Sequence, residues 1–189
     1  MMLFLHGFTI NISEGCSIQA RAYGGNNFAE VKYGYLKLNR VPVWQSSWVG
    51  EHANARGANV FVIDRSTCTL LESKNYDTFG DATAAARLRG YIEGLSDASV
   101  LVGISIDDSS YYMDAAEATL SALGADVSDV EFRGAWAFVT ETGDPSKTVF
   151  DKELTEASAM ARQPFVAATV SGTQCNILQR QVSRDQICG

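Results

Sequence analysis

Two adjacent carboxylates, Asp107 and Asp108, hold the position in this 189-residue sequence that most favours binding chemistry. They follow directly on the apolar run 100–106, which predicts a strand, and binding residues concentrate in loops at strand ends. Carboxylates placed there can coordinate calcium or accept hydrogen bonds from a polar ligand. They can equally form a solvated turn that leads into the next helix. A catalytic pair is disfavoured, because adjacent positions do not set the separation that a glycosidase needs.

A second charged candidate, Arg133, stands just before the apolar run 134–139. Its guanidinium can pair with a carboxylate such as Asp77 or Asp107 and hold two loops together, or it can donate to a ligand. The sequence favours neither role over the other.

Aromatic side chains in polar stretches form a third group of candidates. Tyr111 and Trp48 are the ones we select, with Trp44 and Tyr112 in similar positions near strand ends or in loops. An exposed ring there can stack on a ligand or anchor a partner, although half-buried packing is the commoner fate of such rings. Trp136, in contrast, lies within an apolar strand and is predicted to be core.

Other kinds of active site have no support in the sequence. It contains no G-x-S-x-G, Walker or G-x-G-x-x-G motif, and its two histidines, His6 and His52, are isolated. We therefore predict no catalytic residue and no cofactor.

The elements that must position these residues are mostly strands. The densest apolar run, 60–63, predicts a central strand buried on both faces, and 70–77 returns beside it as a hairpin with a polar connection at 64–67. Alternating or apolar patterns predict further strands at 17–23, 28–33, 36–44, 100–106, 136–139 and 165–170. Pro42 marks an edge or a strand end. Segment 45–56 is expected to be a long loop, 140–147 a turn, and the tail after 172 lacks periodicity.

Two helices are expected. The first begins at Asp81 as N-cap and buries Leu88, Ile92 and their helical neighbours. The second spans 115–123, with Asp114 and Glu117 as a capping-box-like pair and a glycine stop at position 124.

Composition and charge bound the class of protein. Hydrophobic residues make up 46% and charged residues 20%, so one domain with its own core is expected. The net charge is −7 without a basic cluster, which disfavours nucleic acid and anionic membranes as partners. No run is long enough to span a membrane. The first residues resemble either a poor signal peptide or a strand, and we favour the strand because Phe8, Ile10 and Ile12 alternate.

The cysteines indicate disulfides. Cys16, Cys68, Cys175 and Cys188 include no C-x-x-C pair, so a zinc site is disfavoured. The sequon at Asn11 and the even cysteine count both favour a secreted glycoprotein. The sequence cannot choose among the possible connectivities. We favour Cys16 paired with Cys175 or Cys188, and an unpaired Cys68 or Cys188 could join chains.

Five landmarks occur in an order and spacing that match a known family. They are Arg-Gly-Ala-Asn-Val at 56–60, Tyr-Asp-Thr at 76–78, Ile-Asp-Asp-Ser at 106–109, Leu-Gly at 123–124 and Phe-Arg-Gly-Ala-Trp-Ala-Phe at 132–138. Over about residues 17–143 the chain resembles the interleukin-like EMT inducer domain, also called PANDER-like. That family includes small secreted cytokine-like proteins and the stem domain of protein O-mannose N-acetylglucosaminyltransferase.

The resemblance implies an α+β fold, in which two antiparallel sheets form a compact β-sandwich with short flanking helices, and no catalysis by the domain. It also implies that Asp107 and Arg133 correspond to the acid and base that contact sugar in the glycosyltransferase stem. A carboxylate that accepts from vicinal hydroxyls, an arginine fork and an aromatic face suit a neutral sugar.

The chain departs from the family pattern around this site. The family has Lys before the acid and Glu-Gly after it, where this chain has Ile106 and Asp108-Ser109. It has Asp after the arginine, where Gly134 stands, and a basic stretch where residues 140–143 read Thr-Glu-Thr-Gly. The site is therefore more acidic, which speaks against hyaluronan or a sulfated glycan.

Together these observations predict a secreted, lectin-like, non-enzymatic module for a neutral glycan or glycoprotein. The predicted ligand contacts are Asp107, Asp108, Arg133, Tyr111 and Trp48. The expected organisation is an N-terminal extension at 1–16, the domain at 17–171 and a cysteine-bearing tail at 172–189. The alternative is a cytokine-like or assembly protein that binds another protein or self-associates.

Overall fold

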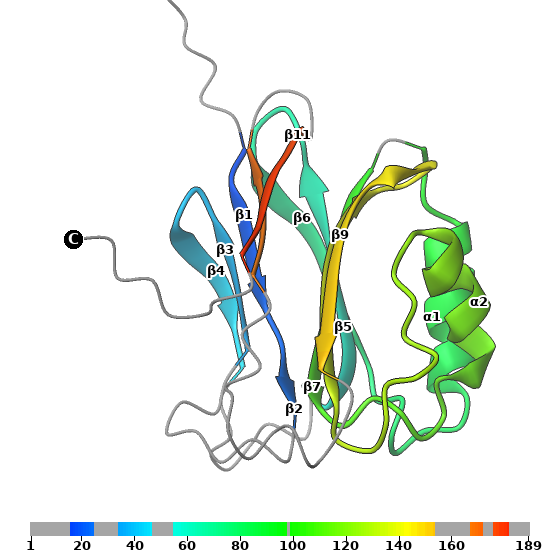
Figure 1. Ribbon diagram of the computed structural model, residues 1–189. Coiled ribbons are helices and arrows are strands. Elements are labelled where there is room, and N and C mark those ends of the chain that lie inside the picture. Colours follow the sequence, from blue (N-terminus) through cyan, green and yellow to red (C-terminus); the bar gives the residue numbers. More distant parts are fainter. Residues whose placement is uncertain are drawn as a thin grey trace, which may run out of the picture.

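Two stacked β-sheets, with helices on the outer face of the larger one, make up the computed structural model (Figure 1). The structure describes residues 16–24, 34–46, 55–97, 99–153, 167–171 and 176–181. The sheets pack face to face, and both helices lie on the side of the larger sheet that faces away from the smaller one (Figure 1). The predicted α+β two-sheet sandwich is confirmed.

The larger sheet has the strand order β6-β5-β7-β8-β9. Its strands are antiparallel: β5 (Gly57–Asp64), β6 (Thr69–Tyr76), β7 (Val100–Asp107), β8 (Ala135–Glu141) and β9 (Asp144–Glu153). A short strand, β2 (Tyr23–Gly24), pairs in parallel with the last two residues of β7. The predicted β5–β6 hairpin is confirmed.

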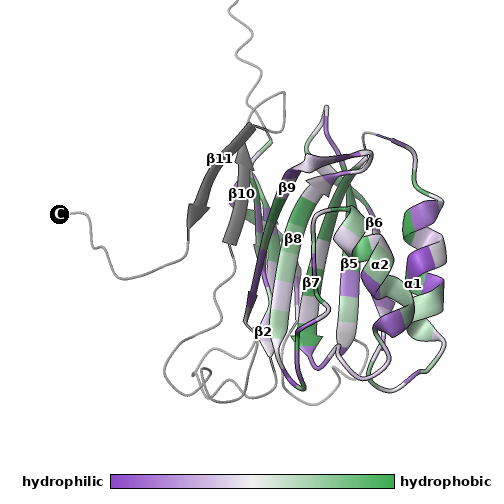
Figure 2. Ribbon diagram, turned by 45° about the vertical axis from the view of Figure 1, so that its right-hand side comes forward, coloured by the Kyte–Doolittle hydropathy of each residue, from purple (hydrophilic) through white to green (hydrophobic). Residues whose placement is uncertain are grey.

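The central strands β5 and β7 are buried along all but their last residue. Their side chains alternate between two cores, because successive residues of a strand point to opposite faces. Phe61 and Val102 face the smaller sheet, whereas Val60 and Leu101 face the helices, where Trp136 is fully buried as predicted. Figure 2 shows β7 and β8 coloured mainly as hydrophobic, while α1 carries hydrophilic residues on its outer turns.

Helix α1 (Ala84–Glu93) buries Leu88 and Ile92 against the sheet, as predicted. Its first turn differs from the prediction, because Thr83 and not Asp81 occupies the N-cap position. Asp81 instead caps the turn before the helix, where its Oδ1 accepts the backbone N–H of Thr83 at 2.8 Å and the hydroxyl at 2.7 Å.

Helix α2 (Asp114–Ala122) begins after Met113, which makes no side-chain cap. The predicted capping box of Asp114 and Glu117 is therefore wrong, since both residues lie inside the first turn. They still carry negative charge at a helix N-terminus, which the helix dipole favours. Gly124 ends the helix with φ +87°, as predicted.

The smaller sheet has the strand order β11-β10-β1-β3-β4. Its strands are β1 (Ile18–Arg21), β3 (Tyr35–Leu38), β4 (Val41–Gln45), β10 (Ala167–Ser171) and β11 (Asn176–Gln181). The edge strand β4 holds Pro42, as its position predicts. The alternating segment 36–44 proves to be a hairpin, β3–β4, whose turn at Asn39-Arg40 has positive φ at both residues. Sequence reasoning missed this turn because Arg is not a residue that favours positive φ.

Two further strands escaped prediction. β9 starts at Asp144, inside the segment expected to be a turn, and Gly143 with φ +84° makes the tight connection from β8. β11 lies in the tail that lacked periodicity and pairs with β10. The strands predicted at 1–12 and 28–33, and most of the loop at 45–56, lie outside the described residues.

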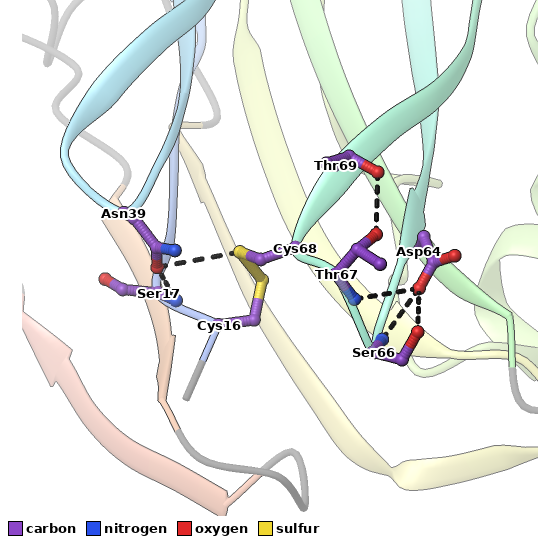
Figure 3. The surroundings of a disulfide bond; sticks show 8 residues. All are labelled: Cys16, Ser17, Asn39, Asp64, Ser66, Thr67, Cys68 and Thr69. Atoms are coloured by element: carbon purple, nitrogen blue, oxygen red, sulfur yellow. Dashed lines mark hydrogen bonds between the residues drawn. A yellow bond between two sulfur atoms is a disulfide. The ribbon is translucent and has the colours of Figure 1, made fainter. Parts of the chain in front are cut away.

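One disulfide joins Cys16 to Cys68 in the part of the chain that the structure describes (Figure 3). The expected pairing of Cys16 with Cys175 or Cys188 is wrong, and the latter two cysteines lie outside the described residues. The bond ties the segment before β1 to the β5–β6 turn, so it connects the two sheets across 52 residues of chain. Asn39 Oδ1 accepts the N–H of Ser17 at 2.9 Å and lies 3.6 Å from the Cys68 sulfur, a van der Waals contact because a disulfide sulfur has no proton.

The β5–β6 turn that carries Cys68 is organised by Asp64. Its Oδ1 accepts the backbone N–H groups of Ser66 at 2.7 Å and Thr67 at 3.0 Å (Figure 3). The predicted cysteine pairing was the one that closes the longest loops. The stacking of the two sheets instead places the β5–β6 turn, with Cys68, beside Cys16. In the described residues no helix is long and apolar enough to cross a membrane.

Candidate functional site

The predicted polar residues meet at one end of the larger sheet, the lower end in Figure 1, where β7 stops and β5 and β8 begin. We call this surface the rim and define it as Arg56 with residues 77–81, 107–112 and 131–134. Chain segments far apart in sequence converge here because, in an antiparallel sheet, one strand ends where its two neighbours begin.

Asp107 and Asp108 each place an unsatisfied oxygen at the rim. Asp107 is half-buried, and its Oδ1 is buried without a hydrogen bond. Asp108 is 2% exposed; its Oδ1 accepts the N–H and the hydroxyl of Ser110, both at 2.8 Å, but its Oδ2 is buried without a hydrogen bond. A buried acceptor left unpaired costs about 1–3 kcal/mol, and more if charged. The solvated-turn interpretation therefore fails for Asp108, which is buried within its turn.

Burial and neighbouring charges act on the pKa of Asp107 in opposite directions. Burial raises its pKa, the charge of Arg133 opposes that rise, and Asp108 adds to it. The same carboxylate acts on Tyr23, whose pKa is raised by burial and then by Asp107. Arg133 is exposed, and its positive charge opposes the rise of both pKa values.

Asp107 and Arg133 also share an uncommon backbone conformation. Their φ angles are +62° and +60°, in the left-handed region; Asp107 ends strand β7, and Arg133 stands in the turn 131–134. Such conformations cost of order 1–3 kcal/mol and concentrate at functional sites. Gly24, which pairs with Asp107, packs so closely on the carbonyl of Arg133 that a Cβ there would collide with it.

Arg56 and Asp77 form the structural brace of the rim. Arg56 Nε lies 2.9 Å from Asp77 Oδ1 and its Nη2 lies 2.6 Å from Oδ2, a two-point fork. Burial alone would raise the pKa of Asp77, but the bonds from Arg56 and from the Gly80 N–H hold it below its ordinary value. Asp77 thus pairs with Arg56, and Arg133 is left to act on Asp107. Gly80 has no room for a Cβ, which would meet this ion pair.

Beside these charges, four rings touch one another in a row, and we call them the aromatic cluster: Tyr112, Tyr111, Phe79 and Phe132. Their successive centroid separations are 4.5, 5.9 and 6.1 Å. The Arg56 guanidinium lies 4.9 Å over the Phe79 ring, and that of Arg133 lies 5.0 Å over the Phe132 ring. The predicted Tyr111 belongs to this cluster.

Sequence reasoning missed Phe79 and Phe132 as site residues. Both stand beside family landmarks, Phe79 just after Tyr-Asp-Thr and Phe132 within the landmark that contains Arg133. That adjacency was the available signal. Trp44, another candidate ring, proves to be packing, since it contacts the buried Phe61 edge-on at 4.9 Å. Trp48 and the sequon at Asn11 lie outside the described residues.

The loop that carries Tyr111 is fastened to the core through Thr78 and Ser109. The buried Thr78 hydroxyl donates to the Ser109 carbonyl at 2.9 Å, and its own carbonyl accepts the Tyr112 N–H at 2.8 Å. The indole N–H of the core residue Trp136 donates to the Ser109 hydroxyl at 2.8 Å. These bonds explain why the Tyr-Asp-Thr landmark matters to the rim although Thr78 itself is inaccessible.

The rim offers acceptors, guanidinium donors and apolar rings in one place. Within the described residues no group of three or more potential ligands could hold a metal ion. The charges of Arg56 and Arg133 beside Asp107 also disfavour a bound cation, so the calcium interpretation loses its physical basis.

The fold and the rim define a β-β-α domain with a polar and aromatic surface at one sheet end, and comparison with known proteins names the class. Residues 56–144 match the family model described as interleukin-like EMT inducer. This part of the chain is a domain of that family. The matched segment holds every residue of the rim, whereas strands β1 to β4, β10 and β11 lie outside it.

Two curated relatives agree with this assignment. The cell migration-inducing and hyaluronan-binding proteins of Mus musculus and Homo sapiens are each 32% identical to the chain over 98 residues. The similarity covers 51% of this chain and 7% of either relative.

Proposed function

We propose that the protein is a secreted, non-enzymatic carbohydrate-binding module that holds a neutral glycan at the rim through Asp107, Asp108 and Arg133. The observation that carries the proposal is the partly exposed carboxylate of Asp107 beside the exposed guanidinium of Arg133. Sugar hydroxyls are donors that would satisfy such acceptors, and Arg133 supplies donors for ring or acetyl oxygens.

The charge of the rim supports a neutral ligand over an anionic one. Arg56 is already paired with Asp77, and Arg133 acts on Asp107, which Asp108 follows in the chain. The chain as a whole carries −7. The two curated relatives are named for hyaluronan binding, but a polyanion would meet net repulsion on this chain.

Secretion is part of the proposal and has two supports. The Cys16–Cys68 disulfide suits an oxidising compartment, and the sequon at Asn11 suits a glycoprotein.

A titration with immobilised and free sugars tests the proposal. We expect a neutral monosaccharide, such as galactose or N-acetylglucosamine, to bind the parent, and Asp107→Ala and Arg133→Ala to weaken it tenfold or more. The matched controls are Asp97→Ala and Arg89→Ala, which remove the same charges from exposed positions away from the rim. Absence of binding on a neutral glycan array, or unchanged binding in both rim variants, would refute the proposal. Preference for hyaluronan oligosaccharides would refute its neutral-ligand part.

A second candidate, binding of another protein as a cytokine-like or assembly factor, is favoured by the exposed aromatic cluster. Tyrosine, other aromatics and arginine are typical of interface hot spots. Sedimentation of the parent and of Phe132→Ala over a range of concentrations tests self-association. A dimer that the substitution abolishes would support this candidate, and a monomer at all concentrations would exclude the self-associating version.

A further inference from the structure

We propose that the rim binds at least two consecutive sugar units, one at the carboxylates and Arg133 and the next stacked on Tyr111 and Phe132. The ligand is then a neutral oligosaccharide of at least two units. This inference rests on the proposed carbohydrate function and specifies the minimum length of its ligand.

The aromatic cluster is the main exposed apolar surface of the described residues. Tyr111 is 65% exposed, Phe132 50% and Tyr112 37%, whereas the other large exposed apolar side chains lie on the edge strands β4 and β6. Contiguous exposed apolar surface on a soluble domain commonly marks a binding site. The half-buried Phe79 supports it, because Tyr111 and Phe132 both contact that ring.

Two of the four rings, Phe79 and Phe132, are each packed against an arginine before any ligand arrives. Phe79 carries the Arg56 guanidinium, which the Asp77 fork fixes, and Phe132 carries that of Arg133. A surface ordered in advance loses less conformational entropy on binding. The cluster is therefore suited to a small, rigid ligand.

Two arginines each interact with both a ring of the aromatic cluster and the rim carboxylates. Arg133 lies over Phe132 and acts on Asp107, and Arg56 lies over Phe79 and is acted on by Asp107 and Asp108. A sugar that bonds the Asp107 carboxylate is thus separated by a guanidinium from a sugar that stacks on a ring. This arrangement suits two neighbouring units of one chain better than a single unit.

The ring tilts limit the aromatic part to one sugar. Phe79 and Tyr111 are inclined at 58°, and Phe79 and Phe132 at 44°, so the cluster is not flat. A pyranose ring can lie on one aromatic face and touch the edge of another. The mixture of acceptors, donors and apolar faces favours a sugar over a purely apolar partner, because pyranose rings have hydroxyl edges and carbon-bound hydrogens on their faces.

The test compares monosaccharides with their disaccharides by calorimetry and by ligand-observed NMR. The probes are galactose with lactose, glucose with cellobiose, and N-acetylglucosamine with its β1,4 disaccharide. We expect one disaccharide to bind about tenfold more tightly than its monosaccharide, which corresponds to roughly 1.4 kcal/mol. Phe132→Ala and Tyr111→Ala should remove that gain, so that the monosaccharide and the disaccharide bind with equal affinity, whereas Asp107→Ala should weaken both ligands and keep the gain.

Control variants keep the test interpretable. Leu71→Ala removes an exposed apolar side chain from β6, 63% exposed, and should change neither affinity. Phe132→Leu retains bulk without an aromatic face and should behave like Phe132→Ala, while an unchanged melting temperature confirms that the variants fold.

The two proposals fail in different ways. Equal affinity for mono- and disaccharide, or a gain that survives in both aromatic variants, would overturn the two-unit site and leave the carbohydrate function standing. Absence of any sugar binding would overturn the function and the inference with it. Binding of a polypeptide lost in Phe132→Ala, without sugar binding, would assign the cluster to a protein partner instead.

Discussion

Replacing Asp107 with asparagine should make the protein more stable and abolish its proposed activity. The side chain keeps its shape but loses its charge, and the charged form is the one that burial penalises. Because asparagine keeps the acceptor oxygen but removes the charge that burial penalises, relief of about 1 kcal/mol is expected at neutral pH. For a chain of this size that corresponds to a rise in Tm of roughly 2–4 °C. Affinity for the glycan should fall tenfold or more.

The pH dependence of this gain has a definite sign. Asp107 has a raised pKa in the folded protein, so between 3.8 and that raised value the folded state binds more protons than the unfolded state. The parent therefore loses stability as pH rises through this window. The difference in Tm between Asp107→Asn and the parent should be near zero below pH 3.8, grow as pH rises, and then level off.

Asp77→Asn is the matched control, with the opposite sign. Its carboxylate has a lowered pKa because Arg56 and the Gly80 N–H overcome the effect of burial, so it stabilises the fold above pH 3.8 and loses that effect as pH falls. Replacing it should lower stability by about 1 kcal/mol at neutral pH. Thermal melts by circular dichroism at several pH values measure both variants. If Asp107→Asn melts at or below the parent temperature at neutral pH, the charged Asp107 does not destabilise the fold and the reasoning is wrong.

Three further outcomes follow from the structure. The Cys16→Ser, Cys68→Ser double variant should unfold more readily by up to about 4 kcal/mol, the chain-entropy value for its loop, as measured by urea titration with and without reductant; equal stability would contradict the bond. Thr78→Val should lower the free energy of unfolding by about 1–2 kcal/mol, because the Ser109 carbonyl would stay buried without its hydrogen bond, and unchanged urea midpoints would argue against that role. Gly24→Ala should weaken sugar binding by displacing the Arg133 carbonyl, so parental affinity would show that the turn adapts.

The strand pattern and the sandwich followed from residue periodicity and from the family landmarks. Runs such as 60–63 and 100–106 are buried on both faces, and a continuous apolar run predicts that well. Strand β9 was missed because its first residues, from Asp144 to Lys147, are polar turn formers that serve as the start of an edge strand. The N-cap of α1 was misplaced by two residues because Asp81 caps a turn that precedes the helix.

Of the candidate site, sequence indicated Asp107, Arg133 and Tyr111, and the structure places all three on one rim. It could not indicate that Asp77 pairs with Arg56, since partner choice depends on which loops the sheet brings together. Phe79 resembles an ordinary core residue in sequence, because an aromatic beside a helix start is usually packing. Its contact with two exposed rings exists only once the strand ends converge.

The short pairing of β2 with the end of β7 makes the rim a composite of two chain regions. Gly24 comes from outside the segment that matches the family, yet it lies against the turn of Arg133 and pairs with Asp107. A fragment cut to residues 56–144 would keep every rim side chain and lose the backbone that holds two of them in their left-handed conformations. Sequence change in the N-terminal strands could therefore retune ligand binding without altering a single contact residue, and grafting the family segment alone onto another protein would transfer the residues but not their geometry.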